Sequence, residues 1–404
     1  MSRSSTFPAS HILVIGAGAF GLAAAIELRR RGHSVTVLDP GPVPHPLAAS
    51  TDISKVIRME YGPDELYTEL GERAREGWLA WNREQAERGE APLYHETGVL
   101  MLSRDPMAAG GFEHESWTLL RRRGHSPERM DQTTVRHRFP AWSGAAYRDG
   151  FFHARGGYAE SGRAVAAMAR RAAAVGVSLA AGTPVASLLE RSGRIVGVRD
   201  AAGREIGADH VVAAVGAWTS KLIPALAQAI RPTGHPVFHL RPRDAEPFRA
   251  RSFPVFTADI ARTGYYGFPL NRDGVVKIGH HGVGTPTDPD ASRFVSPAAF
   301  DSLRLFLTDT FPALADAEIV YTRLCLYADT QDGDFWIARD PEREGLTVAS
   351  GDSGHGFKFA PILGTVNADA VEGRPNPVLE RFRWRPEVRL PHGREAARHR
   401  PSRS

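Results

Sequence analysis

The chain has 404 residues, 42% of them hydrophobic, so it is long enough to bury one large core or two smaller ones. It has no run of about eighteen apolar residues and its start lacks the layout of a secretory signal, which predicts a cytoplasmic protein without a membrane segment. A single cysteine excludes an internal disulfide and agrees with a reducing compartment.

The net charge of +4 arises at the C-terminus. Residues 380–404 hold eight arginines and three glutamates, a local charge of +5, so the rest of the chain is nearly neutral. This end has no apolar period, and we expect residues 385–404 to form a disordered basic tail. The distribution argues against a nucleic-acid or membrane partner, with a tail that binds an anionic molecule as the alternative.

The N-terminal segment predicts a βαβ unit. An apolar strand at 11–15 precedes a helix at 20–31 and a second strand at 34–39. Two later blocks show a similar mixture of helices and apolar strands. They contain a helix at 162–175, a strand near 177–179, a hairpin of 185–190 with 194–200, a strand at 210–216, a strand at 346–350, a glycine loop at 351–356 and a helix at 358–371.

Between these blocks lie segments rich in aromatic strands and turns, which predict a second domain on a mostly antiparallel sheet. The active site is expected at the interface of the two domains, where ligand clefts tend to lie. The predicted elements are strands at 98–103, 264–268 and 275–279 and a helix at 297–308.

The loop after the first strand carries a nucleotide-binding pattern. Gly16 makes a tight turn, Gly18 lets the backbone approach a pyrophosphate, and Gly21 lets the helix pack on the strand. Asp39 ends the second strand, where a carboxylate accepts hydrogen bonds from ribose hydroxyls. The alternative is a structural turn without a ligand, and the pattern alone leaves NAD and FAD open.

Arginine dominates the basic residues, so the four lysines stand out. They are Lys55, Lys221, Lys277 and Lys358, and an ammonium can lose its proton whereas a guanidinium effectively cannot. All four, together with Cys325, fall within a set of recognisable segments. These segments are residues 16–21, 54–62, 96–100, 215–222, 265–269, 277–281, 325–332 and 353–358.

In this order the segments resemble the monomeric sarcosine oxidase family of flavin amine oxidases, within the FAD-dependent D-amino acid oxidase superfamily. The group includes N-methyltryptophan and pipecolate oxidases and, more distantly, fructosyl amino acid oxidases. The resemblance runs from Gly16 to about Pro377 and implies FAD as the cofactor. The expected fold class is α/β. A Rossmann-type FAD-binding domain (1–84, 156–235 and 323–384) carries an inserted, mostly antiparallel-sheet substrate domain (85–155 and 236–322).

The resemblance also assigns residues to the flavin. Cys325 matches the position whose sulfur forms a thioether to the flavin, whereas a lone buried cysteine is more commonly an apolar filler. The helix that follows the glycine loop at 351–356 would direct its N-terminus at the flavin ring. Further residues placed at the cofactor are Val185, Trp218, Gly354, His355 and Gly356, and no metal site is expected.

Catalytic roles follow from the same resemblance. Lys277 matches the lysine that assists the reaction with molecular oxygen, because a fixed cation stabilises superoxide. Arg58 and Lys358 match the pair that grips the substrate carboxylate. Tyr266 and His281 match residues that line the substrate pocket. For each residue the alternative is structural: a solvent-facing lysine, an ordinary ion pair of Arg58, or a packed core side chain.

One segment departs from the sarcosine oxidase pattern. Residues 51–55 read Thr-Asp-Ile-Ser-Lys, which looks more like fructosyl amino acid oxidases, and Lys55 could relay a proton if it does not simply pair with Asp52. We predict an oxidase of a secondary or N-substituted amino acid that yields an imine and hydrogen peroxide. The alternatives are an Amadori-product oxidase, a flavin dehydrogenase with another electron acceptor, and an NAD-binding protein. A monomer is one possible oligomeric state.

Overall fold

A computed structural model describes residues 8–142, 146–387 and 398. The chain divides into two compact units. Within the described residues the first unit comprises 8–52, 161–232 and 327–387, and the second comprises 53–160 and 233–326. The predicted basic tail lies outside the described residues from 388 onward, apart from residue 398.

The first unit is built on a six-stranded sheet. Its order is β20-β21-β13-β1-β2-β9, and all neighbours are parallel except β20 and β21. The strands are β1 (His11–Ile15), β2 (Ser34–Asp39), β9 (Ser178–Ala181), β13 (His210–Ala213), β20 (Trp336–Arg339) and β21 (Leu346–Ser350). The apolar runs of β1 and β13 are buried, as expected for parallel strands covered on both faces.

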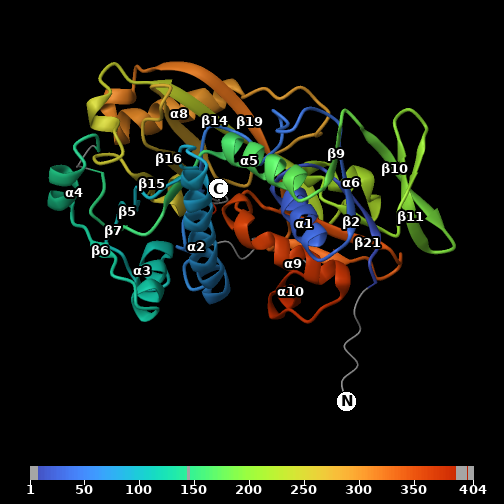
Figure 1. The fold of residues 1–404 in the computed structure, drawn as a ribbon. Coiled ribbons are helices and arrows are strands. Elements are labelled where there is room, and N and C mark those ends of the chain that lie inside the picture. The colour runs from blue at the N-terminus through green and yellow to red at the C-terminus, as the bar shows by residue number, and fades with distance from the viewer. Residues whose placement is uncertain (1–7, 143–145, 388–397, 399–404) are drawn as a thin grey trace. The chain divides into compact units, whose positions relative to one another are not determined.

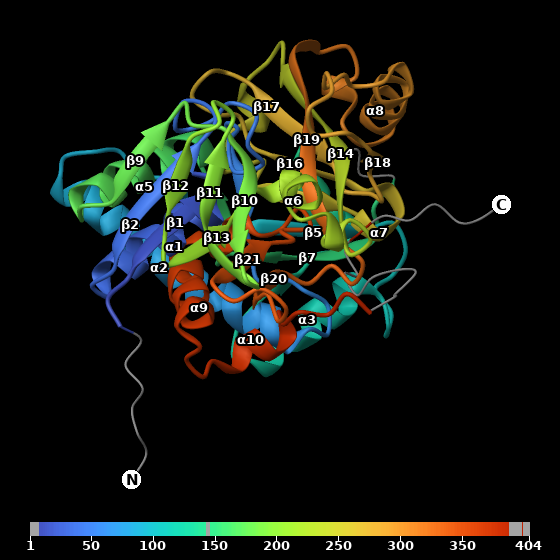
Figure 2. The same ribbon diagram turned by 90° about the vertical axis from the view of Figure 1, so that its right-hand side faces the viewer.

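Helices and a second sheet cover this core. Helix α1 (Ala19–Arg30) is flanked by α5 (Ser161–Ala174) and α9 (Ala360–Glu372), as Figure 1 shows. A three-stranded antiparallel sheet, β10 (Val185–Arg191), β11 (Arg194–Asp200) and β12 (Glu205–Gly207), lies beside β13 (Figure 2). The smaller helices of the unit are α6 (Thr219–Leu222) and α10 (Pro377–Arg381).

The second unit contains a nine-stranded, mostly antiparallel sheet. Among the strand pairs whose register is known for the described residues, only β5 with β15 is parallel. Its strands are β5 (Val99–Ser103), β6 (Glu128–Arg129), β7 (Asp149–His153), β14 (Ile230–Arg241), β15 (Val255–Ala258), β16 (Tyr265–Phe268), β17 (Val276–His280), β18 (Thr285–Pro286) and β19 (Glu318–Thr330). Trp142, Phe256 and Phe311 meet edge to face at the centre of its core.

Helices and a small sheet complete the second unit. The helices are α2 (Glu65–Glu87), α3 (Phe112–Arg122), α4 (Gln132–Arg138), α7 (Ile260–Thr263) and α8 (Pro297–Thr310), and the sheet joins β3 (Lys55–Ile57), β8 (Gly157–Ala159) and β4 (Tyr94–His95). The described part of the chain has no helix with both the length and the hydrophobicity needed to cross a membrane.

The units differ from the predicted division mainly at residues 53–84, which were expected in the first domain. In the structure β3 pairs with β8, and the side chain of Asn82 in α2 hydrogen-bonds the backbone of Leu93 and Tyr94. These contacts place the segment in the second unit.

Glu113 in α3 provides a test of the second unit's packing. Burial raises the pKa of Glu113 from 4.5 to about 7, and one of its oxygens, Oε1, has no hydrogen-bond partner among the described residues. The Glu113 carboxyl group therefore loses its proton at lower pH in the unfolded chain than in the folded protein. As a result, the free energy of unfolding falls as the pH rises from about 4.5 to about 7.

We predict that Glu113→Gln stabilises the protein by about 3 kcal/mol above pH 7, because the amide keeps the shape without the buried charge. The gain should shrink toward pH 5, where Glu113 is protonated in the folded protein. Thermal unfolding of both proteins at about pH 5 and about pH 8 measures this. An equal gain at both pH values would contradict the assignment to a titrating carboxyl.

Candidate functional site

The glycine loop of the first unit has the geometry of a nucleotide-binding turn. Gly16 has a φ of +98°, and a Cβ there would lie 2.5 Å from the carbonyl oxygen of Ala214. A Cβ at Gly21 would lie 1.9 Å from the Gly16 oxygen, so α1 packs onto the loop only without a side chain here. Gly18 forms the N-cap of α1.

Asp39 holds the far side of this loop. It is buried at the end of β2, and its Oδ2 accepts a hydrogen bond from the Ala17 amide at 2.8 Å while Oδ1 accepts one from Gly41 at 3.1 Å. The carboxylate is thus oriented beside the glycine loop, at the position expected for a ribose-binding acid. The loop, the N-terminus of α1 and Asp39 together fit the ADP half of FAD.

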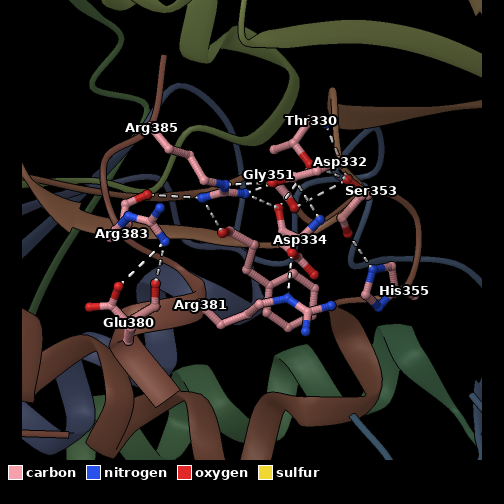
Figure 3. A network of polar contacts seen from close by, with 12 residues as sticks. Thr330, Asp332, Asp334, Gly351, Ser353, His355, Glu380, Arg381, Arg383 and Arg385 are labelled. Atoms are coloured by element: carbon pink, nitrogen blue, oxygen red, sulfur yellow. Dashed lines mark hydrogen bonds and ion pairs between the residues drawn. The ribbon is translucent and has the colours of Figure 1, made fainter. Parts of the chain in front are cut away.

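A second glycine loop follows β21 and is fixed by a polar network (Figure 3). Ser353, with a left-handed φ of +44°, places its Oγ 3.2 Å from both the backbone nitrogen and the Oγ1 of Thr330. His355 Nε2 lies 2.9 Å from the Gly333 carbonyl oxygen. The end of β19 and the segment that follows it therefore hold the loop through hydrogen bonds.

Arginines from the end of the chain hold that segment in turn. Arg385 is buried and makes a bidentate ion pair with Asp332, with nitrogen to oxygen distances of 2.6 and 2.8 Å. Arg381 pairs with Asp334 at 2.5 Å, as Figure 3 shows. The predicted solvated tail was thus wrong at its first residue, because Arg385 contributes to the first unit rather than to solvent.

Lys358 lies just after this loop. A 3-10 turn at Phe357–Phe359 precedes α9, so the helix begins two residues later than predicted. The Lys358 side chain is 2% exposed, and its Nζ donates to the His355 carbonyl oxygen at 2.9 Å. The predicted cofactor residues Val185 and Trp218 lie in the same unit, at the start of β10 and in the 3-10 turn Gly216–Trp218.

The second unit brings together Lys55, Lys277 and Cys325. Cys325, in β19, is 1% exposed, and its sulfur lies 3.8 Å from Lys55 Nζ. Lys277, in β17, is also 1% exposed. Its Nζ donates to the carbonyl oxygen of Ser54, the residue before Lys55, at 2.5 Å. Its ammonium lies 4.9 Å from the centre of the Phe268 ring. The structure thus excludes a solvent-facing Lys277.

Arg58 follows β3 and is only 6% exposed. Its guanidinium carbon lies 4.7 Å from the centre of the Tyr61 ring and 5.8 Å from that of Phe112. Among the described residues no hydrogen-bond partner reaches Nη1, which is buried. A buried guanidinium of this kind is costly unless an anion completes it.

The predicted pocket residues Tyr266 and His281 belong to the same unit. Tyr266, in β16, pairs with Gly279 of β17, and a Cβ on Gly279 would lie 2.7 Å from the Tyr266 hydroxyl oxygen. His281 is buried directly after β17, with its ring centre 6.3 Å from that of His235. Tyr266 is two positions from Phe268, the register partner of Lys277, whereas His281 lies just beyond the last paired residue of β17.

The structure adds a pair that the sequence reasoning missed. Glu60 is 1% exposed, and its Oε1 lies 2.6 Å from Nδ1 of His153, which is also buried. Burial alone would raise the pKa of Glu60, but the hydrogen bond with His153 and the charges of His153 and Arg58 hold it below its usual value. Only the position of Glu60, two residues after Arg58, could have indicated the pair.

Comparison with known proteins identifies the class. Residues 11–370 match the family described as FAD dependent oxidoreductase, and the chain belongs to this family. The resemblance and the α/β fold class predicted from the sequence are confirmed, and the protein is an FAD-dependent oxidoreductase.

Individual relatives are similar over nearly the whole chain. Monomeric sarcosine oxidase from Bacillus sp. (strain B-0618) is 28% identical over 360 residues, which cover 88% of this chain and 90% of the relative. N-methyl-L-tryptophan oxidase from Salmonella agona is 29% identical, with 90% and 95% covered. The crystal structure of fructosamine oxidase (Amadoriase II) from Aspergillus fumigatus superimposes with a TM-score of 0.83 at 27% identity, covering 97% of this chain and 94% of that one.

Proposed function

We propose that the protein is an oxidase of a secondary or N-substituted amino acid, which forms an imine and reduces molecular oxygen to hydrogen peroxide. The observation that carries the proposal is Arg58, a buried guanidinium bounded by two aromatic rings, whose Nη1 has no hydrogen-bond partner in the described part of the chain. A substrate carboxylate would supply the acceptor that Nη1 lacks.

The relatives support the choice of substrate class. By their names they act on sarcosine, N-methyl-L-tryptophan and, for the Schizosaccharomyces pombe protein that is 28% identical, L-saccharopine. All three are N-substituted amino acids with a carboxylate. In the proposed reaction Arg58 and Lys358 bind that carboxylate and orient the carbon next to nitrogen. FAD, when bound, accepts the hydride and supplies the redox chemistry.

The remaining predicted residues receive roles consistent with their surroundings. Lys277 provides a fixed, buried cation for the reduction of oxygen. Lys55 lies beside the Cys325 sulfur, the atom that would form the bond to FAD. Lys55 then serves as a proton relay through water, while Tyr266 and His281 line the substrate pocket.

A second candidate is an Amadori-product oxidase. Residues 51–55 resemble fructosyl amino acid oxidases, and the fructosamine oxidase structure is one of the similar folds. A flavin dehydrogenase with another electron acceptor is the third, since the buried Lys277 does not by itself fix the acceptor.

The proposal predicts that the purified protein releases peroxide with at least one of sarcosine, pipecolate and proline, because each offers a carboxylate and a C–H bond next to a secondary amine. Peroxide release and anaerobic flavin reduction, measured for these and for fructosyl-glycine, test it. Reaction only with fructosyl-glycine would favour the Amadori alternative. Rapid anaerobic reduction with slow reoxidation in air would favour the dehydrogenase.

The covalent link is tested by denaturation. If Cys325 forms a thioether to FAD, acid precipitation leaves the yellow colour in the protein pellet, because a carbon–sulfur bond survives unfolding. Cys325→Ser should move all of the colour to the supernatant while keeping a similar volume. The absorbance of pellet and supernatant measures this, and a colourless pellet of the parent protein would refute the link.

The role of Lys277 predicts a separation of the two half-reactions. Lys277→Met keeps the length of the side chain without its charge, so reoxidation by oxygen should slow by about a hundredfold or more, the loss typical of one electrostatic stabiliser. Anaerobic reduction should change far less. Stopped-flow measurement of both half-reactions, with the exposed Lys221→Met as the control, tests this. Equal losses in both would exclude a specific role with oxygen.

A further inference from the structure

Glu60 is a buried carboxylate with both oxygens engaged. Its Oε1 lies 2.6 Å from His153 Nδ1, and its Oε2 accepts a hydrogen bond from the Met59 amide at 3.0 Å. Because Glu60 is held in its charged form, Nδ1 must carry the proton and donate it. This holds whether the imidazole is neutral or charged.

Arg58 is only two residues away, and its charge acts on Glu60. A guanidinium and a carboxylate that can reach each other in a buried setting ordinarily form a bidentate pair. The structure shows no such pair between these two residues, and Arg58 instead lies against the rings of Tyr61 and Phe112. One oxygen of Glu60 instead lies within hydrogen-bond distance of His153 Nδ1.

We propose that His153 is a positioning residue for substrate binding: by holding Glu60, it keeps the Arg58 guanidinium available for a substrate carboxylate. This rests on the proposed role of Arg58. Without His153, the low-dielectric surroundings would drive Glu60 to pair with Arg58. The Glu60 carboxylate would then bind the Arg58 guanidinium in place of the substrate carboxylate.

The neighbouring charges supply a matched control. The His125 ring stands edge-on to that of His153, with ring centres 5.1 Å apart, and its Nε2 lies 2.8 Å from Glu72. Glu72 is in turn bound by both Nε and Nη2 of Arg123, at 2.9 and 2.6 Å. The His125–Glu72 pair therefore binds Arg123, and we expect it to have no effect on Arg58.

The test measures carboxylate binding to the holoenzyme directly. Isothermal titration calorimetry with cyclopentanecarboxylate, a proline-like acid without the amine, gives a Kd that depends on Arg58, and cyclopentanecarboxamide is the uncharged control. His153→Leu should raise the Kd of the acid about tenfold, the effect of losing one charge-assisted hydrogen bond, and leave the amide unchanged. His125→Leu should leave both unchanged.

A second substitution separates positioning from simple structural damage. Adding Glu60→Gln to His153→Leu removes the competing carboxylate and should return the Kd of the acid to within about threefold of the parent. His153→Gln, which retains a donor, should bind almost as the parent does. Failure of the double variant to recover, or an unchanged Kd in His153→Leu, overturns the proposal.

Two further comparisons distinguish a failure of the positioning role of His153 from a failure of the proposed function. If Arg58→Met binds the acid as tightly as the parent, the carboxylate role of Arg58 and the proposed function fail together. If Arg58→Met weakens binding but His153→Leu does not, only the positioning role fails. Should His153→Leu not fold, His153→Ala takes its place in the same measurements, because it too lacks the donor that holds Glu60.

Discussion

Burial of positive charge is the constraint on which the candidate site depends. Lys277, Lys358 and Arg58 are 1%, 2% and 6% exposed, and removing such groups from water costs several kcal/mol each unless partners replace the solvent. The ammonium groups donate to the carbonyl oxygens of Ser54 and His355, while Arg58 lies against aromatic rings. Because Arg58 Nη1 has no hydrogen-bond partner among the described residues, this guanidinium keeps positive potential for an anionic ligand.

Much of the first unit could be predicted, because local patterns determine it. The predicted strand at 34–39 has the observed bounds of β2, and the helix after the glycine loop is displaced by one residue at each end. Residues 53–84 could not be placed, because their unit is determined by the pairing of β3 with β8, about a hundred residues away, which leaves no periodic trace in either segment. Arg385 was misassigned for a similar reason: its composition is that of a tail, and only Asp332 makes it part of the core.

The candidate site shows the same limit at the level of side chains. Motifs identified Lys55 and Cys325, but their 3.8 Å separation depends on a fold that joins residues 270 positions apart. Glu60 and His153 lie 93 positions apart, and an isolated histidine in an apolar strand predicts nothing about its partner. Sequence reasoning thus selected single residues and missed the Glu60–His153 contact, since contacts between distant segments leave no local pattern.

The retention of lysine in an arginine-rich chain has a physical reason in this arrangement. Lys277 donates to the Ser54 carbonyl oxygen, and its ammonium lies near the Phe268 ring. An ammonium is a compact point charge that such a setting can accommodate, whereas a planar guanidinium would bring five donors and a larger volume into the same buried position. Arg58 meets the opposite requirement, because a planar fork between two rings suits a planar anion. The two kinds of cation are therefore not interchangeable here, and the composition of the chain reflects the geometry of what each one contacts.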